Sequence, residues 1–143
     1  MQEIKQIKYN SSEYFSAVVL RDEILRKPLG IVFTKQFLQQ DENDLMFVLI
    51  EDDKICATLN YSILSKSSLK MRQVAVCNSM QAKGFGKKLV GFSEKKIKDL
   101  AYSRIELHAR ETAVRFYEKL NYKIIGEGFY EVGILHYKMF KDL

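Results

Sequence analysis

A glycine-containing turn between a strand and a helix constrains this chain more than any other feature. The segment Gln81–Gly86 reads Gln-Ala-Lys-Gly-Phe-Gly and follows the apolar, strand-like run Val74–Val76. Glycines leave backbone amides uncovered, and the first amides of a helix have no partner within the helix. Such a helix start attracts anions, above all phosphates. Lys87 and Lys88 follow at once, where positive charge opposes the helix dipole unless an anion is bound. We therefore predict a diphosphate-binding loop.

Two common phosphate-binding loops do not fit this segment. A Walker A loop requires a glycine five residues before its Gly-Lys pair and Ser or Thr after it. Here Gln81 and Lys88 occupy those positions. A Rossmann loop requires a third glycine where this chain has Leu89, although Glu106 lies at a suitable distance for the acidic partner. The chain after the loop is also too short for a large parallel sheet.

Three segments together resemble the GNAT superfamily of N-acetyltransferases. Gln-x-x-Gly-x-Gly after a Val-x-Val strand is similar to the family's acetyl-CoA pyrophosphate loop. Ala113–Tyr122 resembles its Ala-x-x-Phe-Tyr-x-x-x-Gly-Phe helix and turn, with Asn121 in place of the glycine. Asparagine also tolerates the left-handed conformation that this position requires. Gly128–Met139 resembles the Phe-x-Glu-x-Gly-Ile-x-His ending of the ElaA-like branch of small bacterial members.

The periodicity of apolar residues agrees with this resemblance. It predicts strands at residues 4–8, 45–50, 55–64, 69–76, 104–109, 122–126 and 134–140, and helices at 12–26, 33–40, 84–101 and 111–120. Strands that alternate with helices in the second half indicate a mixed α/β sheet. We expect one domain over residues 1–143 of the α/β (α+β) class. The resemblance implies the GNAT fold, a mixed, mostly antiparallel central sheet of six to seven strands with about four flanking helices.

The resemblance also implies a co-substrate and a set of contacts. Acetyl-CoA would bind with its pantetheine arm along the strand that ends at Val76 and its diphosphate on the loop. The implied cofactor-binding residues are Val74, Val76, Gln81, Ala82, Lys83, Gly84, Phe85, Gly86, Lys87 and Lys88. A backbone N–H near Val76 would stabilise the oxyanion that forms on the thioester carbonyl.

Acetyl transfer to an amine needs a proton acceptor for the amine and a proton donor for the thiolate that leaves. By resemblance Tyr117 is the candidate donor, although its place on an apolar helix face also suits a packing role. Glu131 and His136 are the candidate bases. We expect Arg21, Arg26 and His108 to contact the acceptor, and the two arginines would suit an acidic or phosphorylated one. Residues 81–88 give no information about the acceptor. We expect it to be an amine, either of a small molecule or of a protein.

Composition limits the alternatives. No run approaches the roughly 18 apolar residues of a membrane span. Cys56 and Cys77 are too few for a disulfide framework, so we expect a reduced, cytoplasmic setting. The two histidines lie far apart, which argues against a metal site. The net charge of +5 raises the alternative of nucleic-acid binding, which lacks a supporting motif. The sequence leaves open a second function, that of a non-catalytic acyl-CoA-binding module. It also leaves open a homodimer, which is common among GNAT proteins.

Overall fold

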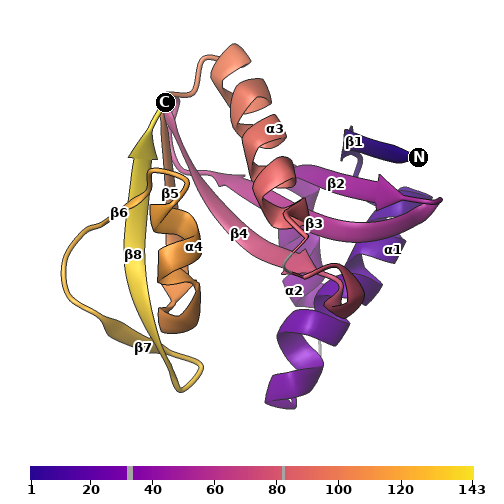
Figure 1. The fold of residues 1–143 in the computed structure, drawn as a ribbon, viewed down its shortest axis with the longest axis horizontal. Helices are drawn as coiled ribbons and strands as arrows, with labels where there is room; N and C mark the ends of the chain where they lie inside the picture. Colours follow the sequence, from indigo (N-terminus) through magenta and orange to yellow (C-terminus); the bar gives the residue numbers. More distant parts are fainter. Residues whose placement is uncertain (32–33, 82) are drawn as a thin grey trace.

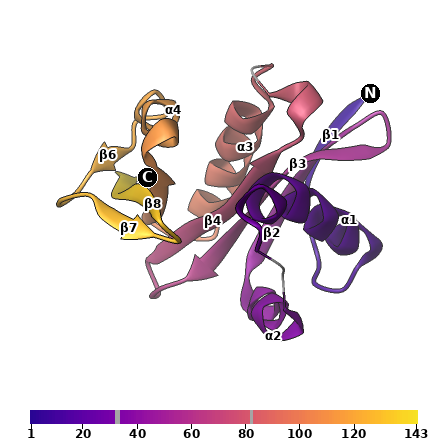
Figure 2. The same ribbon diagram turned by 90° about the horizontal axis from the view of Figure 1, so that it is seen from below.

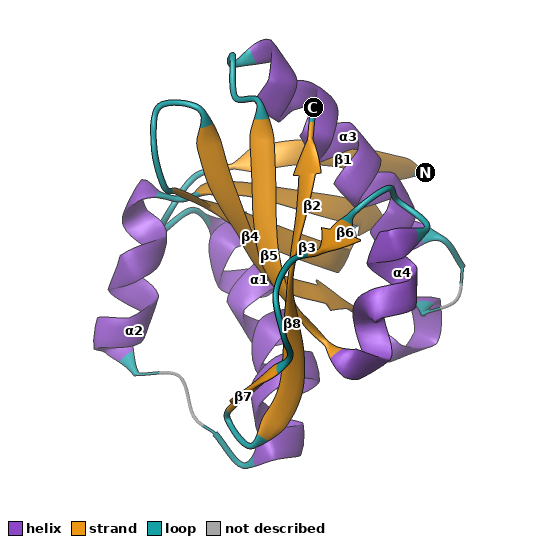
Figure 3. Cartoon of the chain, turned by 90° about the vertical axis from the view of Figure 1, so that its left-hand side faces the viewer, coloured by secondary structure: helices purple, strands orange, loops and turns teal. Residues whose placement is uncertain are grey.

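The computed structural model describes residues 1–31, 34–81 and 83–143, and its centre is a twisted sheet. Eight strands are described, in the order β1-β2-β3-β4-β5-β8-β6, with β7 paired to the start of β8 (Figure 3). Their bounds are β1 Gln2–Ile7, β2 Leu45–Glu51, β3 Lys54–Ile63, β4 Ser68–Val76, β5 Arg104–Arg110, β6 Lys123–Ile124, β7 Phe129–Glu131 and β8 Ile134–Asp142. Of the described pairings, β4 with β5 is parallel and the others are antiparallel. The predicted fold class is confirmed, and β7 is the strand that the sequence did not predict.

Helices cover both faces of this sheet. Figure 2 shows α3 on one face and α1 and α2 on the other. Their bounds are α1 Ser12–Arg21, α2 Lys35–Gln39, α3 Phe85–Asp99 and α4 Val114–Glu118. The chain after α1 continues as a π-helical turn, Asp22–Arg26, and a 3-10 turn, Lys27–Leu29. Both Ser11 and Ser12 are suitable cap residues in the sequence, and Ser11 caps α1, because its hydroxyl accepts a hydrogen bond from the Tyr14 amide. The predicted start of the second helix at Phe33 lies outside the described residues.

Burial follows the two faces of β2. Phe47 and Leu49 belong to the core under α3, whereas Met46 and Val48 pack in the smaller core under α1. Because successive side chains of a strand point to opposite faces, a strand covered on both faces is apolar throughout. Leu89, Phe92, Ile97 and Leu100 are spaced as one apolar face of a helix, which predicts that all four pack on the sheet. Leu100 is instead exposed at the end of α3.

A bulge in β4 opens the sheet beside β5. Gln73 has a φ of 56°, and the register shifts so that Asn60 faces Arg72 while Thr58 faces Ala75. One residue of β3 therefore lies opposite two of β4, which bends the bulged strand. The parallel pairing of β4 with β5 ends at Met71 opposite Leu107. Beyond that point the two strands diverge (Figure 1).

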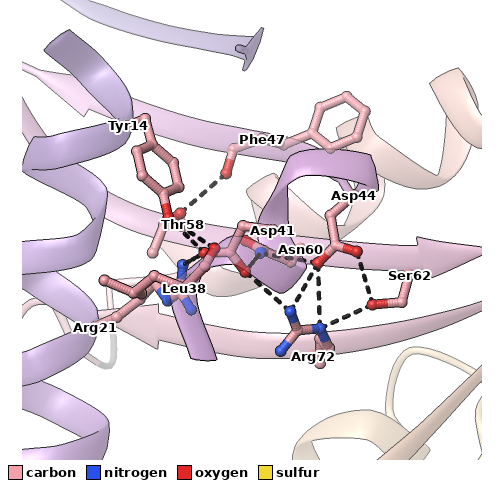
Figure 4. A network of polar contacts seen from close by, with 10 residues as sticks. All are labelled: Tyr14, Arg21, Leu38, Asp41, Asp44, Phe47, Thr58, Asn60, Ser62 and Arg72. Atoms are coloured by element: carbon pink, nitrogen blue, oxygen red, sulfur yellow. Dashed lines mark hydrogen bonds and ion pairs between the residues drawn. The ribbon is translucent and has the colours of Figure 1, made fainter. Parts of the chain in front are cut away.

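A buried polar network holds the strand at this bulge. The Asp41 carboxylate is 0% exposed and accepts hydrogen bonds from Tyr14 Oη at 2.7 Å and Arg21 NH1 at 2.7 Å (Figure 4). It also accepts them from Asn60 Nδ2 at 3.1 Å and Arg72 NH2 at 2.9 Å. The network thus joins α1, the 3-10 turn Gln40–Asn43, β3 and β4.

A second carboxylate completes the network on the outer side. Asp44 Oδ2 lies 3.2 Å from Arg72 Nε and 3.0 Å from Arg72 NH2, and its Oδ1 accepts from Ser62 Oγ at 2.9 Å. Two arginines and two aspartates therefore balance in charge. A buried ion pair is costly to desolvate, but removing one partner leaves a buried charge without compensation.

Replacing Asp41 by asparagine therefore destabilises the protein. We predict that Asp41→Asn lowers the free energy of unfolding by about 3 kcal/mol or more, since Arg21 and Arg72 both lose the buried Asp41 carboxylate and only Arg72 is also paired with Asp44 in this network. Urea unfolding monitored by circular dichroism measures the change. The control is Asp99→Asn at the exposed end of α3, which should leave stability unchanged. Equal stability of the two variants would contradict the role of Asp41.

The turn between β7 and β8 carries an unusual residue. Glu131 pairs with Ile134, so Val132 and Gly133 form a two-residue turn, with φ values of 47° and 75°. Positive φ at both positions is typical of a type I′ turn, which favours Asn-Gly. A β-branched residue is strained there. Val132 is exposed, so burial does not compensate for this strain.

Relief of this strain should stabilise the hairpin. We predict that Val132→Asn raises the free energy of unfolding by about 1 kcal/mol, because asparagine tolerates the left-handed conformation that costs other residues roughly 1–2 kcal/mol. Val132→Ile keeps the branched side chain and should give no gain. Thermal unfolding of the three proteins checks this. A variant with asparagine that melts no higher than the isoleucine variant would refute it.

Candidate functional site

A cavity of about 500 Å³ lies where β4 and β5 diverge, and we call it the β4–β5 cavity. Its lining comes from the chain after α1, from β4, from β5, from α4 and from the β7–β8 hairpin. Six residues predicted to act at the site line it, namely Arg26, Val74, His108, Tyr117, Glu131 and His136. These positions are spread over more than a hundred residues of sequence, and the fold brings them together.

Tyr117 lines the cavity from α4. The residue is 7% exposed, and its ring packs edge-on against Phe116 and Tyr122, with centroids at 5.0 and 5.7 Å. Within the part of the chain that the structure describes, the hydroxyl has no hydrogen-bond partner. Burial raises the pKa of Tyr117 above its usual value of about 10. The phenol therefore stays protonated at neutral pH and can donate a hydrogen bond.

Glu131 lies between the two histidines of the chain. Its Oε1 is 3.4 Å from His108 Nδ1, and its Oε2 is 3.6 Å from His136 Nε2. The Nδ1 of His136 lies 2.8 Å from the carbonyl oxygen of Ile134. Because a carbonyl only accepts hydrogen bonds, Nδ1 of His136 carries a proton. In the neutral ring Nε2 then holds the free lone pair and faces the carboxylate.

The His108 ring is held neutral by its surroundings. Burial lowers the pKa of His108, the charge of Lys70 lowers it further, and the contact with Glu131 opposes both. Phe129 packs against both imidazoles, edge-on to His108 at 4.9 Å and stacked on His136 at 6.0 Å between ring centroids. The hairpin therefore supplies a carboxylate and the His136 imidazole, and β5 supplies the His108 imidazole, all positioned to accept a proton.

The predicted loop follows β4 and begins α3. The Gln81 side chain folds back, so that Nε2 donates to the Val76 carbonyl at 3.0 Å and to Asn78 Oδ1 at 3.2 Å. Gly84 precedes α3 with a φ of 80°, a conformation that side chains disfavour. The first bond of the helix runs from the Lys88 amide to the Gly84 carbonyl.

The start of α3 presents positive charge and amides that have no partner within the helix. The amides of Phe85, Gly86 and Lys87 precede that first bond and have no carbonyl within the helix. Phe85 and Gly86 are buried, and Lys83, Lys87 and Lys88 are exposed. A Cβ at Gly86 would lie 3.2 Å from the Phe116 ring, so glycine also permits α3 to pack closely on α4. The predicted contact Ala82 lies outside the described residues.

The side of β4 that faces β5 connects the loop to the cavity, and we call residues 74–76 on that side the open edge. The Cys77 amide donates to the Cys56 carbonyl of β3 at 2.8 Å. Alternate amides of a strand point to opposite sides. The Val76 amide therefore points away from β3, toward the open edge. Val74 lines the cavity, and the Val76 side chain lies next to Gly86 at the start of α3. The open edge therefore runs from the cavity to the predicted loop.

One expected acceptor residue does not reach the cavity. Arg21 was expected to contact the acceptor, but its side chain is 1% exposed and NH1 is paired with Asp41 at 2.7 Å. The lining residues do not include it, and its place in the buried network of Figure 4 favours a structural role. Arg26, five residues later, lines the cavity and lies with its guanidinium 4.7 Å from the centre of the Phe37 ring.

Three basic lining residues were missed from the sequence, Lys70, Arg72 and Arg110. A signal for two of them was present. Lys70 and Arg72 alternate with the buried Leu69 and Met71, so they share one face of β4. Alternation alone does not show that this face borders a cavity, because the divergence of β4 from β5 is not visible in the sequence.

None of the helices in the described part of the chain is long and apolar enough to cross a membrane. Over the ranges 1–31, 34–81 and 83–143, no three His, Cys, Asp or Glu side chains are grouped as metal ligands would be. Cys56 and Cys77, opposite each other on β3 and after β4, are both free.

Comparison with known proteins identifies relatives along the chain. The protein is 25% identical to YjcF, an uncharacterised N-acetyltransferase of Bacillus subtilis, over 137 residues that make up 95% of this chain and 97% of YjcF. Two further B. subtilis proteins, the second of them YyaT, are 35% and 31% identical over 73 and 74 residues. Those alignments span 50% of each relative, half of its length.

Solved structures share the fold over nearly the whole chain. A protein from Lactobacillus plantarum superposes with a TM-score of 0.89 at 22% identity, covering 99% of this chain and 98% of its own. Escherichia coli ElaA gives 0.82 at 15% identity, covering 99% of both chains. A GNAT acetyltransferase of Elizabethkingia anophelis with acetyl-CoA bound gives 0.77 at 14%, covering 99% and 98%. At these identities the likeness concerns the fold.

The family itself is shown by the sequence. A family model of the acetyltransferase (GNAT) domain matches residues 20–143, most of the chain. This confirms the resemblance drawn from the loop, the Phe-Tyr helix and the C-terminal segment. The protein belongs to the GNAT acetyltransferase family.

Proposed function

We propose that the protein transfers an acetyl group from acetyl-CoA to a primary amine, by direct attack within a ternary complex. One observation carries this proposal. The open edge of β4 joins the start of α3, whose first amides have no carbonyl within the helix, to a cavity that Tyr117 and Glu131 line. Acetyl-CoA requires such a path, since its diphosphate and its thioester lie at opposite ends of an extended arm. The Elizabethkingia relative in the same fold has acetyl-CoA bound.

The loop would hold the diphosphate. The amides of Phe85, Gly86 and Lys87 and the positive end of the α3 dipole attract it. The exposed Lys83 and Lys87 add charge from the same loop. Gln81 supports the loop from within by bonding to the Val76 carbonyl at 3.0 Å. Positive charge in the first turn of α3, which is unfavourable alone, becomes favourable when the anion is present.

The open edge would hold the reacting group. The pantetheine amides would pair with the backbone at Val74–Val76 as an added strand pairs with a sheet edge. The Val76 amide, which points to that edge, would donate a hydrogen bond to the thioester oxygen. This bond strengthens as negative charge develops on that oxygen in the transition state.

The β4–β5 cavity would hold the acceptor amine, and its residues would move the protons. The amine enters as an ammonium ion and transfers a proton to the Glu131–His136 pair. Its nitrogen then attacks the carbonyl carbon, and as the carbon–sulfur bond breaks the nitrogen releases a second proton to solvent. The leaving thiolate takes a proton from the Tyr117 hydroxyl, and solvent returns a proton to the tyrosinate. The neutral His108 beside Glu131 keeps a further acceptor within reach.

The loop conformation should be necessary for CoA binding. We predict that Gly84→Val weakens CoA binding by about tenfold or more, roughly 1.4 kcal/mol, because a branched residue disfavours a φ of 80° and the loop shifts. Isothermal titration with CoA measures the dissociation constant. The matched control is Gly91→Ala in the middle of α3, where an added Cβ meets nothing within 4 Å. Unchanged affinity of Gly84→Val would remove the loop from the binding site.

The Tyr117 hydroxyl should act in turnover and not in binding. We predict that Tyr117→Phe lowers kcat by about 10²-fold, in the range found for general acids, and leaves CoA affinity unchanged. Release of free thiol in the presence of an amine panel measures kcat. The matched control is Tyr122→Phe, whose hydroxyl donates to Glu94 at 2.7 Å and not to the cavity. If the two variants lose equal activity, Tyr117 has only a packing role. CoA binding without turnover of any amine would instead identify a non-catalytic acyl-CoA-binding module.

A further inference from the structure

The β4–β5 cavity is strongly basic. Among the described residues that line it, four carry a permanent positive charge and one carries a carboxylate. The four are Arg26, Lys70, Arg72 and Arg110, and the carboxylate belongs to Glu131. An amine that accepts an acetyl group arrives with a positive charge of its own. A cavity with this lining repels such a molecule unless the molecule also carries negative charge.

Two of these cations have no internal counterion. Across residues 1–31, 34–81 and 83–143, no carboxylate lies within 4.0 Å of Lys70 Nζ or of the Arg110 guanidinium. Arg72 differs, because it is paired with Asp41 and Asp44 at 2.9 and 3.0 Å. Glu131 faces the two histidines. The positive charges of Lys70 and Arg110 are therefore available to a ligand.

The arginines crowd one another. The pKa of Arg26 is lowered by burial and then by the charges of Arg21, Arg110 and Arg72. The Arg26 guanidinium lies over the Phe37 ring, and its central carbon is 4.7 Å from the ring centre. Like charges held together beside a half-enclosed cavity are unfavourable alone, and an anion between them converts the repulsion into attraction. Arginine in particular suits this role, because its planar guanidinium can donate two parallel hydrogen bonds to two oxygens of a carboxylate or phosphate.

The cavity size limits the ligand. About 500 Å³ is a volume typical of sites for small molecules. Apolar side chains of Ile24, Leu25 and Leu29 share the lining with the charges. A compact molecule with a short apolar spacer between two polar ends suits this mixture.

We propose that the acceptor is a small primary amine that carries an anionic group, a carboxylate or a phosphate, bound by Arg26, Lys70 and Arg110. The amine end then lies toward Glu131 and Tyr117, which line the same cavity. This inference rests on the proposed function, since it names the class of molecule that the same site acetylates. It excludes polyamines as preferred acceptors, because their second ammonium group would meet the arginines.

Three amines of one length test the proposal through thiol release from acetyl-CoA. They are 4-aminobutanoate, butylamine and 1,4-diaminobutane, which differ only in an anionic, neutral or cationic end. A second comparison, of O-phosphoethanolamine with ethanolamine, tests a phosphate as the anionic group. We expect kcat/KM for at least one anionic amine to exceed that of its neutral partner by about tenfold, the effect of one ionic contact of about 1.4 kcal/mol. The proposal is overturned if kcat/KM for butylamine and 1,4-diaminobutane equals or exceeds kcat/KM for the anionic amines. It is also overturned if an acidic peptide is acetylated in preference to both anionic amines.

Substitutions locate the anion. Lys70→Gln and Arg110→Gln should each raise KM for the preferred anionic amine by about tenfold, with a much smaller effect on butylamine. The matched control is Lys66→Gln on the exposed turn between β3 and β4, which does not line the cavity and should change nothing. An equal rise in KM for the anionic and the neutral amine contradicts the assignment of these two residues.

Titration calorimetry separates this inference from the proposed function. If CoA does not bind, the proposed function fails, and titration of 4-aminobutanoate and O-phosphoethanolamine into the free protein still tests the basic site. If CoA binds without turnover, the same titration is made with the CoA-loaded protein. Binding of an anionic amine that Lys70→Gln weakens supports the proposal in either case. No binding of either anionic amine overturns it.

Discussion

The structure depends on one interruption of backbone hydrogen bonding. β4 and β5 pair over Ser68–Met71 and then separate, where Gln73 adopts a φ of 56°. Polar backbone groups on a sheet edge require partners. The open edge therefore provides the amides that an extended ligand can use, and the space beside it is the cavity that Tyr117 and Glu131 line. The Asp41 network fixes Arg72, the residue directly before the bulge, so that the strand bends at this position.

Local features of the site could be predicted because short-range rules govern them. Gly84 has the φ of 80° that a tight entry to a helix requires, and Asn121 has a φ of 73° after α4. Ile105, Leu107 and Ala109 alternate with polar residues in the sequence, as expected for a strand with one buried face, and all three are buried in β5. Each of these depends on neighbours within a few residues, so a single sequence contains the information.

Features set by distant contacts could not be predicted in the same way. Arg21 resembles a surface arginine in sequence, and only the fold places it against Asp41, 20 residues away. The strand β7 and the strained Val132 depend on pairing with β8, and a valine at that turn contradicts ordinary turn preference. Lys70 and Arg110 lie on neighbouring strands, and the fold brings both to the lining of one cavity. A basic acceptor cavity therefore became visible only with the structure.

Amide hydrogen exchange measured by NMR, with and without acetyl-CoA, tests the central claim most directly. In the free protein the Val76 amide faces the open edge, and the first amides of α3 have no carbonyl within the helix. The account predicts that saturating acetyl-CoA slows exchange at Val74 and Val76 and at Phe85–Lys87, and leaves the amides of β1 and β2 unchanged. Binding of acetyl-CoA with no slowing at Val74–Val76, or with protection elsewhere on the sheet instead, would contradict it.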